Sequence, residues 1–138
     1  MSTDLITLSQ DELLTKVEEI FRNNRFHHIP IVLEDKLVGL VSKSDYLFFK
    51  RGFNDDSQSN KIDLFRLKTH KVSDIMTTSI ATLAKDDKIN AALEIFKENL
   101  FHAIPILDNG KLVGILSTFD VIKHLADDKG AVNKRINA

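Results

Sequence analysis

The stretch Phe26-His27-His28-Ile29-Pro30-Ile31 decides the fold, because the chain contains it almost twice. Phe101-His102-Ala103-Ile104-Pro105-Ile106 matches it at five of six positions, 75 residues further on. At the same shift, Lys36-Leu37-Val38-Gly39 recurs as Lys111-Leu112-Val113-Gly114. Two copies are too few for a solenoid, and one copy of about 50 residues is marginal as an independent fold. We therefore expect two like units that pack through their sheets about a pseudo-twofold axis.

Each copy predicts the same order of secondary structure. Apolar residues recur at helical spacing over residues 11–24 and 86–99. Short β-rich runs follow each helix, and the Asn109-Gly110 pair between two of them is typical of a hairpin turn. The pattern predicts an α+β fold made of two β-α-β-β-α repeats. The expected strands are residues 28–33, 36–41, 79–83, 103–107 and 111–116, and the closing helices begin at Ser42 and Ser117.

Different signals are expected to start the first helix of each copy. Ser9 with Glu12 has the spacing of a capping box. Asp86 and Asp87 fall in the expected first turn of the second copy's helix, where the helix dipole favours negative charge.

Composition places the chain among ordinary globular proteins and excludes several classes. Its 138 residues, 43% hydrophobic and 28% charged, have the length of a single domain. A formal net charge of −1 argues against nucleic acid as a partner. The absence of cysteine excludes disulfides and thiolate chemistry and favours a cytoplasmic location. No apolar run is long enough to span a membrane, and residues 1–4 lack the features of a signal peptide.

The repeat divides the chain into a first repeat at residues 1–50, a linker at 51–71, a second repeat at 72–127 and a tail at 128–138. Within the linker, residues 52–60 are polar and predict a flexible loop. Residues 62–67 are more apolar and are expected to pack down. The tail has few apolar residues and is expected to fray.

Three spaced motifs of the second copy resemble those of the cystathionine-beta-synthase (CBS) domain, a regulatory unit that nearly always occurs in pairs. Val72-Ser73-Asp74-Ile75-Met76 resembles the family's opening segment. Residues 101–106 resemble its central strand, and Gly114-Ile115-Leu116-Ser117-Thr118-Phe119-Asp120 resembles its closing signature. The resemblance covers residues 1–127. It implies a non-catalytic sensor that needs no cofactor and holds AMP, ADP, ATP or another adenosyl compound, such as S-adenosylmethionine, in two clefts between the repeats.

The first copy departs from this pattern at its start. It has no counterpart of residues 72–75, because Met1 aligns with Met76. Either the chain is a fragment of a longer protein or the first copy manages without this segment. We expect a fragment, with an effector domain outside it. The resemblance also implies that two such modules join as a homodimer, and that ligand binding controls a partner by shifting repeats or modules.

The closing signatures supply the main candidate binding residues. Each opens a helix, whose N-terminal N–H groups and dipole attract phosphate. The resemblance implies that the Ser or Thr binds phosphate and that the Asp binds both ribose hydroxyls. Ser-x-x-Asp is also the pattern of a helix capping box, so capping alone is the alternative. The candidates are Ser42, Lys43 and Asp45 in the first copy, and Ser117, Thr118 and Asp120 in the second, where Thr118 replaces the cationic Lys43.

Further candidates lie on or beside the strands. A proline inside a strand removes a hydrogen-bond donor, so backbone groups at each Ile-Pro pair could read the adenine edge; a plain edge strand is the alternative. Thr7 and Thr82 precede each first helix, and the resemblance implies contact with ribose or phosphate; simple β-propensity is the alternative. The candidates at the Ile-Pro pairs are Ile29, Pro30, Ile104 and Pro105.

Histidines and aromatic residues complete the candidates. His27 and His102 repeat, and they either approach phosphate or are half-buried with a backbone partner. No metal site is expected, because His27 and His28 would point to opposite faces of a strand. A cluster around the first closing helix is expected to pack in the core or at a dimer surface: Tyr46, Phe48, Phe49 and Phe53.

No catalytic constellation occurs in the sequence. It has no cysteine nucleophile, no Gly-x-Ser-x-Gly elbow and no Walker loop, so we do not expect an enzyme. Two functions are left. The first is a sensor of an adenine nucleotide, and the second is a ligand-free module that dimerises or holds a partner domain.

Overall fold

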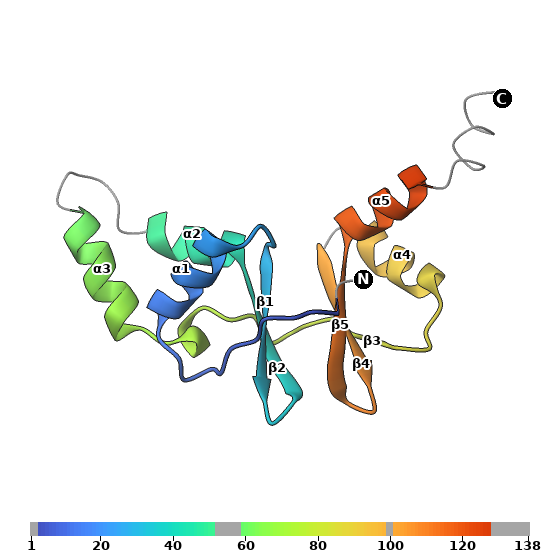
Figure 1. Cartoon of the computed structure of the whole chain (residues 1–138), viewed down its shortest axis with the longest axis horizontal. Helices are drawn as coiled ribbons and strands as arrows, with labels where there is room; N and C mark the ends of the chain where they lie inside the picture. The colour runs from blue at the N-terminus through green and yellow to red at the C-terminus, as the bar shows by residue number, and fades with distance from the viewer. Residues whose placement is uncertain (1–2, 52–58, 99–100, 128–138) are drawn as a thin grey trace. The chain divides into compact units, whose positions relative to one another are not determined.

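The computed structural model of the chain describes residues 3–51, 59–98 and 101–127 (Figure 1). It divides into two compact units. The first-repeat unit is Ile6–Ile80, and the second-repeat unit combines Met1–Leu5 with Ala81–Ala138. Most of the predicted loop (residues 52–58) and the predicted frayed tail (128–138) lie outside the described residues.

The order of elements confirms the predicted α+β class, because each unit contains a helix, a two-stranded hairpin and a closing helix in that order. The first-repeat unit contains α1 (Leu14–Asn23), β1 (His28–Leu33), β2 (Lys36–Ser42), α2 (Lys43–Arg51), α3 (Ser59–Thr69) and the 3₁₀ turn η1 (Val72–Asp74). The second-repeat unit contains β3 (Leu83–Ala84), α4 (Ile89–Lys97), β4 (Ala103–Asp108), β5 (Lys111–Ser117) and α5 (Thr118–Asp127).

The two hairpins agree with the sequence prediction in detail. β1 pairs antiparallel with β2, β4 pairs antiparallel with β5, and the register shifts at Ile31/Val32 and at Ile106/Leu107, which are equivalent positions. Each turn has two residues with positive φ, the conformation that a two-residue hairpin needs. In the first repeat these are Glu34 (51°) and Asp35 (69°), and in the second they are Asn109 (52°) and Gly110 (83°).

The predicted strand at residues 79–83 is wrong in its bounds. β3 is only Leu83–Ala84, which pairs parallel with Ile106 and Leu107 of β4. Residues 59 and 60, predicted as part of the loop, instead begin α3. Leu67 of α3 is buried in the core. The expectation that residues 62–67 pack down is wrong for Leu64 and Phe65, which are 49% and 67% exposed.

The predicted start of the first helix in each repeat is also wrong. α1 begins at Leu14, after Leu13, and makes no side-chain cap. Ser9 and Glu12 instead close a turn, in which the Glu12 N–H donates to the Ser9 carbonyl (3.2 Å). The equivalent turn in the second repeat places Asp87 before α4, where its carboxylate accepts the Ala84 N–H (2.8 Å). The acidic pair 86–87 therefore precedes the first turn of α4, which contains no acidic residue.

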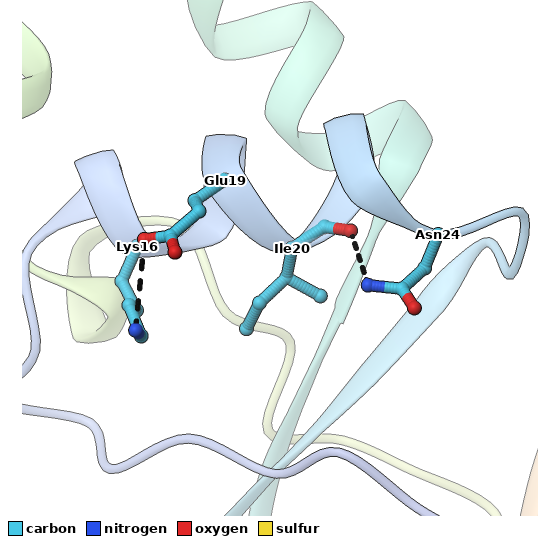
Figure 2. A network of polar contacts seen from close by, with 4 residues as sticks. All are labelled: Lys16, Glu19, Ile20 and Asn24. Atoms are coloured by element: carbon cyan, nitrogen blue, oxygen red, sulfur yellow. Dashed lines mark hydrogen bonds and ion pairs between the residues drawn. The ribbon is translucent and has the colours of Figure 1, made fainter.

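α1 is anchored at both ends by backbone groups. At its start, the Leu14 N–H donates to the carbonyl of His70, a residue distant in sequence (3.0 Å). At its end, the side chain of Asn24 donates to the Ile20 carbonyl (2.8 Å), as Figure 2 shows. Lys16 and Glu19 form an exposed ion pair on the same helix (3.6 Å). The inner face supplies much of the core: Leu14, Val17, Ile20 and Phe21.

α4 has the same apolar spacing as α1 but a less covered face. Ala92 is buried against Ile104 and Ile106. Ile89, the equivalent of fully buried Leu14, is 52% exposed, and Leu93 is 41% exposed. The difference follows from α3 and the segment after it, which pack against α1 in the first-repeat unit. The described part of the second-repeat unit contains no counterpart of these elements.

Residues 70–77, which we name the connecting segment, pack against the first-repeat unit. Val72 is fully buried in the same core as Leu14, and its N–H donates to the Glu12 carbonyl (2.8 Å). Further along, Thr77 and Leu40 exchange two backbone hydrogen bonds of 2.9 Å. Gly39 allows this approach, because a Cβ there would lie 2.7 Å from the Met76 sulfur. The segment that resembles the opening of the second repeat thus completes the core of the first.

Candidate functional site

Each closing signature forms a reciprocal capping box. In the first repeat, the Asp45 N–H donates to Ser42 Oγ (2.9 Å) and the Ser42 N–H donates to Asp45 Oδ2 (3.1 Å). In the second, the Asp120 N–H donates to Ser117 Oγ (3.0 Å) and the Ser117 N–H donates to Asp120 Oδ2 (2.9 Å). The structural role weighed for Ser-x-x-Asp is therefore realised at the start of both α2 and α5.

Capping leaves some hydrogen-bonding atoms of these side chains free. Each serine oxygen accepts a hydrogen bond, which leaves the hydroxyl proton available as a donor. Each carboxylate uses Oδ2, and the described part of the chain contains no hydrogen bond to Oδ1 of Asp45 or Asp120. All four side chains are partly exposed. A ligand with a phosphate and vicinal hydroxyls could therefore bind without breaking either cap.

The backbone donors of the two helix starts are mostly engaged. The Lys43 N–H donates to the His27 carbonyl (2.7 Å), and the Thr118 N–H donates to the His102 carbonyl (3.0 Å). Within the described residues, this leaves the N–H of Ser44, and of Phe119 in the second repeat, as first-turn donors without a protein partner. A phosphate at either start would therefore depend on one amide and the serine hydroxyl.

His27 and His102 act through their carbonyls. Both side chains are exposed rather than half-buried, which corrects one of the two interpretations of these residues. Each carbonyl joins the residue before a hairpin to the first residue of the closing helix. The repetition of this histidine thus coincides with a repeated backbone contact.

The Ile-Pro pairs lie inside the units. All four residues are fully buried, and Pro30 pairs with Leu40 as Pro105 pairs with Ile115. The Pro30 carbonyl accepts the Leu8 N–H (3.1 Å), so it is already used within the first-repeat unit. Side chains with so little accessible surface serve packing. The buried candidates are Ile29, Pro30, Ile104 and Pro105.

Thr7 and Thr82 are exposed and lie just before residues that pair with the hairpins. Leu8 pairs parallel with Ile31, and Leu83 pairs parallel with Ile106. In the first repeat this register places Thr7 two strands from β2, which ends at Ser42. Thr7 is level with Leu40, two residues before Ser42, and two strand spacings of roughly 10 Å in total separate it from that point of β2. The fold thus brings the threonine and the closing signature of each repeat to the same part of the same unit.

The two candidate sites differ in charge. The first contains Lys43, which is partly buried and forms no ion pair within the described residues. The equivalent Thr118 is neutral, and Phe119 beside it is 68% exposed where the first repeat has Ser44. Among the aromatic candidates, Tyr46 is buried in the core 6.1 Å from the Phe21 ring, whereas Phe48 is exposed. Phe53 lies outside the described residues.

The described residues contain neither a metal-ligand cluster nor a membrane-spanning helix. No group of three or more His, Cys, Asp or Glu side chains is placed to hold a metal ion. No helix in that part of the chain has both the length and the apolar character needed to cross a membrane.

Sequence reasoning missed the contact between the connecting segment and β2. Thr77 pairs with Leu40 two residues before Ser42, so this segment borders the strand that leads into the first candidate site. The glycine at position 39 was a visible signal, because glycine inside a strand often marks a close backbone approach. Its partner Met76 could not be named from the sequence, since the contact is not local.

Comparison with known proteins identifies the repeat. The sequence profile of the CBS domain matches residues 1–52 and 72–127. The chain is 28% identical to inosine-5'-monophosphate dehydrogenase of Thermoplasma acidophilum over 86% of its own length, but it spans 21% of that protein.

Solved structures have the same fold over most of the chain. A structure of CBSX2 in complex with AMP shares 25% identity and a TM-score of 0.72, covering 91% of this chain and 90% of the other. The CBS domain pair of MJ0100, in complex with 5'-methylthioadenosine and S-adenosyl-L-methionine, shares 21% identity and a TM-score of 0.72, covering 94% of each chain. With two profile matches that together span most of its length, the chain belongs to the CBS-domain family and carries two copies of that domain.

Proposed function

We propose that the chain is a regulatory module that binds an adenine nucleotide or a related adenosyl compound through its closing signatures. The observation that carries this proposal is the pair of capping boxes that keep a serine donor and a carboxylate oxygen free at equivalent places. The two similar structures, which contain AMP in one case and 5'-methylthioadenosine and S-adenosyl-L-methionine in the other, support the ligand class. We propose a non-catalytic role and, on the cysteine-free sequence, a cytoplasmic location.

In this proposal Asp45 and Asp120 accept the ribose hydroxyls through Oδ1, while Oδ2 continues to cap the helix. Ser42 and Ser117 donate to phosphate, and the exposed Thr7 and Thr82 supply further hydroxyl contacts. His27, His102, Lys43 and Thr118 border the phosphate. In this proposal the buried Ile-Pro pairs shape the unit beneath the ligand.

Regulation requires a partner, which we propose to be a second copy of the module together with an effector domain outside this chain. Ligand binding would act by favouring one arrangement of the protein over another, and its effect is limited by its differential affinity for the two.

The alternative is a ligand-free interaction module, and one observation favours it. The serine, the aspartate and the first helical N–H of both closing helices already have partners inside the chain. A helix start that is satisfied in this way needs no ligand to be stable.

Asn substitution separates the two functions. In Asp120→Asn, the amide oxygen still accepts the Ser117 N–H, so the cap is kept while one acceptor of the carboxylate becomes a donor. Loss of a hydrogen bond to a charged group costs about 1.5–3 kcal/mol, or roughly 10- to 150-fold in affinity. We expect Asp120→Asn and Asp45→Asn to weaken AMP binding by such factors, with unfolding midpoints close to that of the unmodified chain.

Calorimetric titration with AMP, ADP, ATP and S-adenosylmethionine provides the measurement. 2'-Deoxy-AMP provides the control, because its loss of affinity and that of the Asn variant should not add if the carboxylate holds the ribose hydroxyls. Full additivity would reject the ribose contact, and the absence of binding by all four ligands would favour the interaction module.

A further inference from the structure

The turn between β4 and β5 combines the only Asn-Gly pair of the chain with an open surface. Asn109 and Gly110 are both exposed, and they have positive φ values of 52° and 83°. A Cβ built on Gly110 meets no atom within 4 Å. The turn is closed by the pairing of Asp108 with Lys111, so Asn109 and Gly110 are its two central residues.

In a two-residue turn of this kind, the hydrogen bonds of the pairing belong to the closing residues. The amide nitrogen of Gly110 is therefore not held in the ladder, and no side chain shields it. One atom within reach is the carboxamide carbon Cγ of Asn109, which precedes it in the chain.

We infer that Asn109 is a site of spontaneous deamidation. The Gly110 nitrogen attacks Asn109 Cγ, the new N–Cγ bond closes a succinimide ring, and the Cγ–Nδ2 bond breaks with release of ammonia, which carries away the amide proton. Water then opens the ring at either carbonyl carbon. Opening at Cγ gives aspartate, and opening at the main-chain carbonyl gives isoaspartate. Each product adds one negative charge to a chain whose formal net charge is −1.

The first repeat shows which product the turn tolerates. Glu34 and Asp35 occupy the equivalent positions with φ values of 51° and 69°, so carboxylate side chains fit both places. The aspartate product keeps the same main chain and leaves the hairpin intact. Isoaspartate instead routes the main chain through the former side-chain carbon. That lengthens the closed turn between Asp108 and Lys111 and disturbs the register of β4 with β5.

The experiment incubates the purified full chain under warm, mildly alkaline conditions and follows released ammonia, ion-exchange mobility and the peptide map. We expect a more acidic species in which the change maps to Asn109, with isoaspartate detected by isoaspartyl methyltransferase. The isoaspartate form separated by ion exchange should unfold at a lower temperature than the aspartate form.

The matched control is Gly110→Asp, which copies Asp35 and therefore suits the positive φ of this position. A side chain on residue 110 crowds the attacking nitrogen, and we expect it to slow deamidation by about tenfold or more. Asn109→Asp should be stable to incubation and should unfold like the unmodified chain. An unchanged rate in Gly110→Asp, or modification that maps to other asparagines, would overturn the inference.

Discussion

Truncation of one equivalent side chain in each repeat tests how differently the two copies are covered. Leu14 of α1 and Ile89 of α4 occupy the same position of the repeat, yet Leu14 is fully buried and Ile89 is 52% exposed. Leu14→Ala removes apolar atoms from the core and leaves a cavity, which costs about 2–5 kcal/mol. Ile89→Ala removes a similar volume from a half-exposed position and leaves no closed cavity. It should lower the free energy of unfolding by about 1 kcal/mol.

The assay is thermal unfolding followed by circular dichroism at two protein concentrations. With roughly 4 °C per kcal/mol for a chain of this size, the thermal midpoint should fall by about 8–20 °C in Leu14→Ala and by about 4 °C in Ile89→Ala. Hydrogen exchange of α1 and α4 assigns each loss to its own unit. Equal losses would refute the reasoning, and an Ile89→Ala loss that depends on concentration would mean that an assembly covers α4.

Three further predictions test named contacts of the first-repeat unit and of the caps. Gly39→Ala should cost about 1–3 kcal/mol through overpacking against Met76, and the combination with Met76→Ala should be more stable than the two single losses predict; simple addition of the losses in urea unfolding would argue against the contact. Ser42→Ala and Ser117→Ala should each cost about 1 kcal/mol, with near-equal midpoint shifts because the two caps have the same geometry; a large inequality would contradict that equivalence. Val72→Ala should cost about 2 kcal/mol and speed hydrogen exchange in α1, whereas faster exchange confined to α4 would place the residue in the wrong core.

The hairpins could be predicted because their signals are local. Turn residues 34–35 and 109–110 lie between the expected strands, and each pair of strands is antiparallel as a hairpin requires. The helix starts could not be predicted in the same way. α1 begins where the distant His70 carbonyl meets the Leu14 N–H, and no residue near Ser9 reveals that contact. The local capping patterns therefore gave the wrong start for α1 and α4.

The candidate site shows a different limit of sequence reasoning. Ser117 and Asp120 were assigned two roles, a cap and a ligand contact, and both draw on the same residue types at the same spacing. The structure establishes the cap through two hydrogen bonds. It also shows which atoms the cap leaves free. The sequence motif alone does not specify those atoms. The ligand contact stays a prediction.

The apolar stripe of α4 was predicted from spacing, but spacing does not say what covers a stripe. Only Ala92 of that helix is buried, because the elements that cover α1 have no counterpart in the described part of the second-repeat unit. The exposure of Ile89 therefore depends on residues far along the chain, and a repeat detected in the sequence is not a repeat of environments.

The position of Val72 has a consequence for how such a chain may be divided. A profile boundary falls at residue 72, whereas the compact first-repeat unit extends to Ile80. A cut before Val72 would remove the Val72 side chain from the core that contains Leu14. It would leave that side chain on the C-terminal piece without its core. A cut after Ile80 would keep the Val72 N–H on the Glu12 carbonyl and the paired Thr77 and Leu40 together. The unit that recurs in the sequence and the unit that folds compactly therefore have different boundaries along the chain. A gene segment duplicated at the sequence boundary would not by itself encode a complete core.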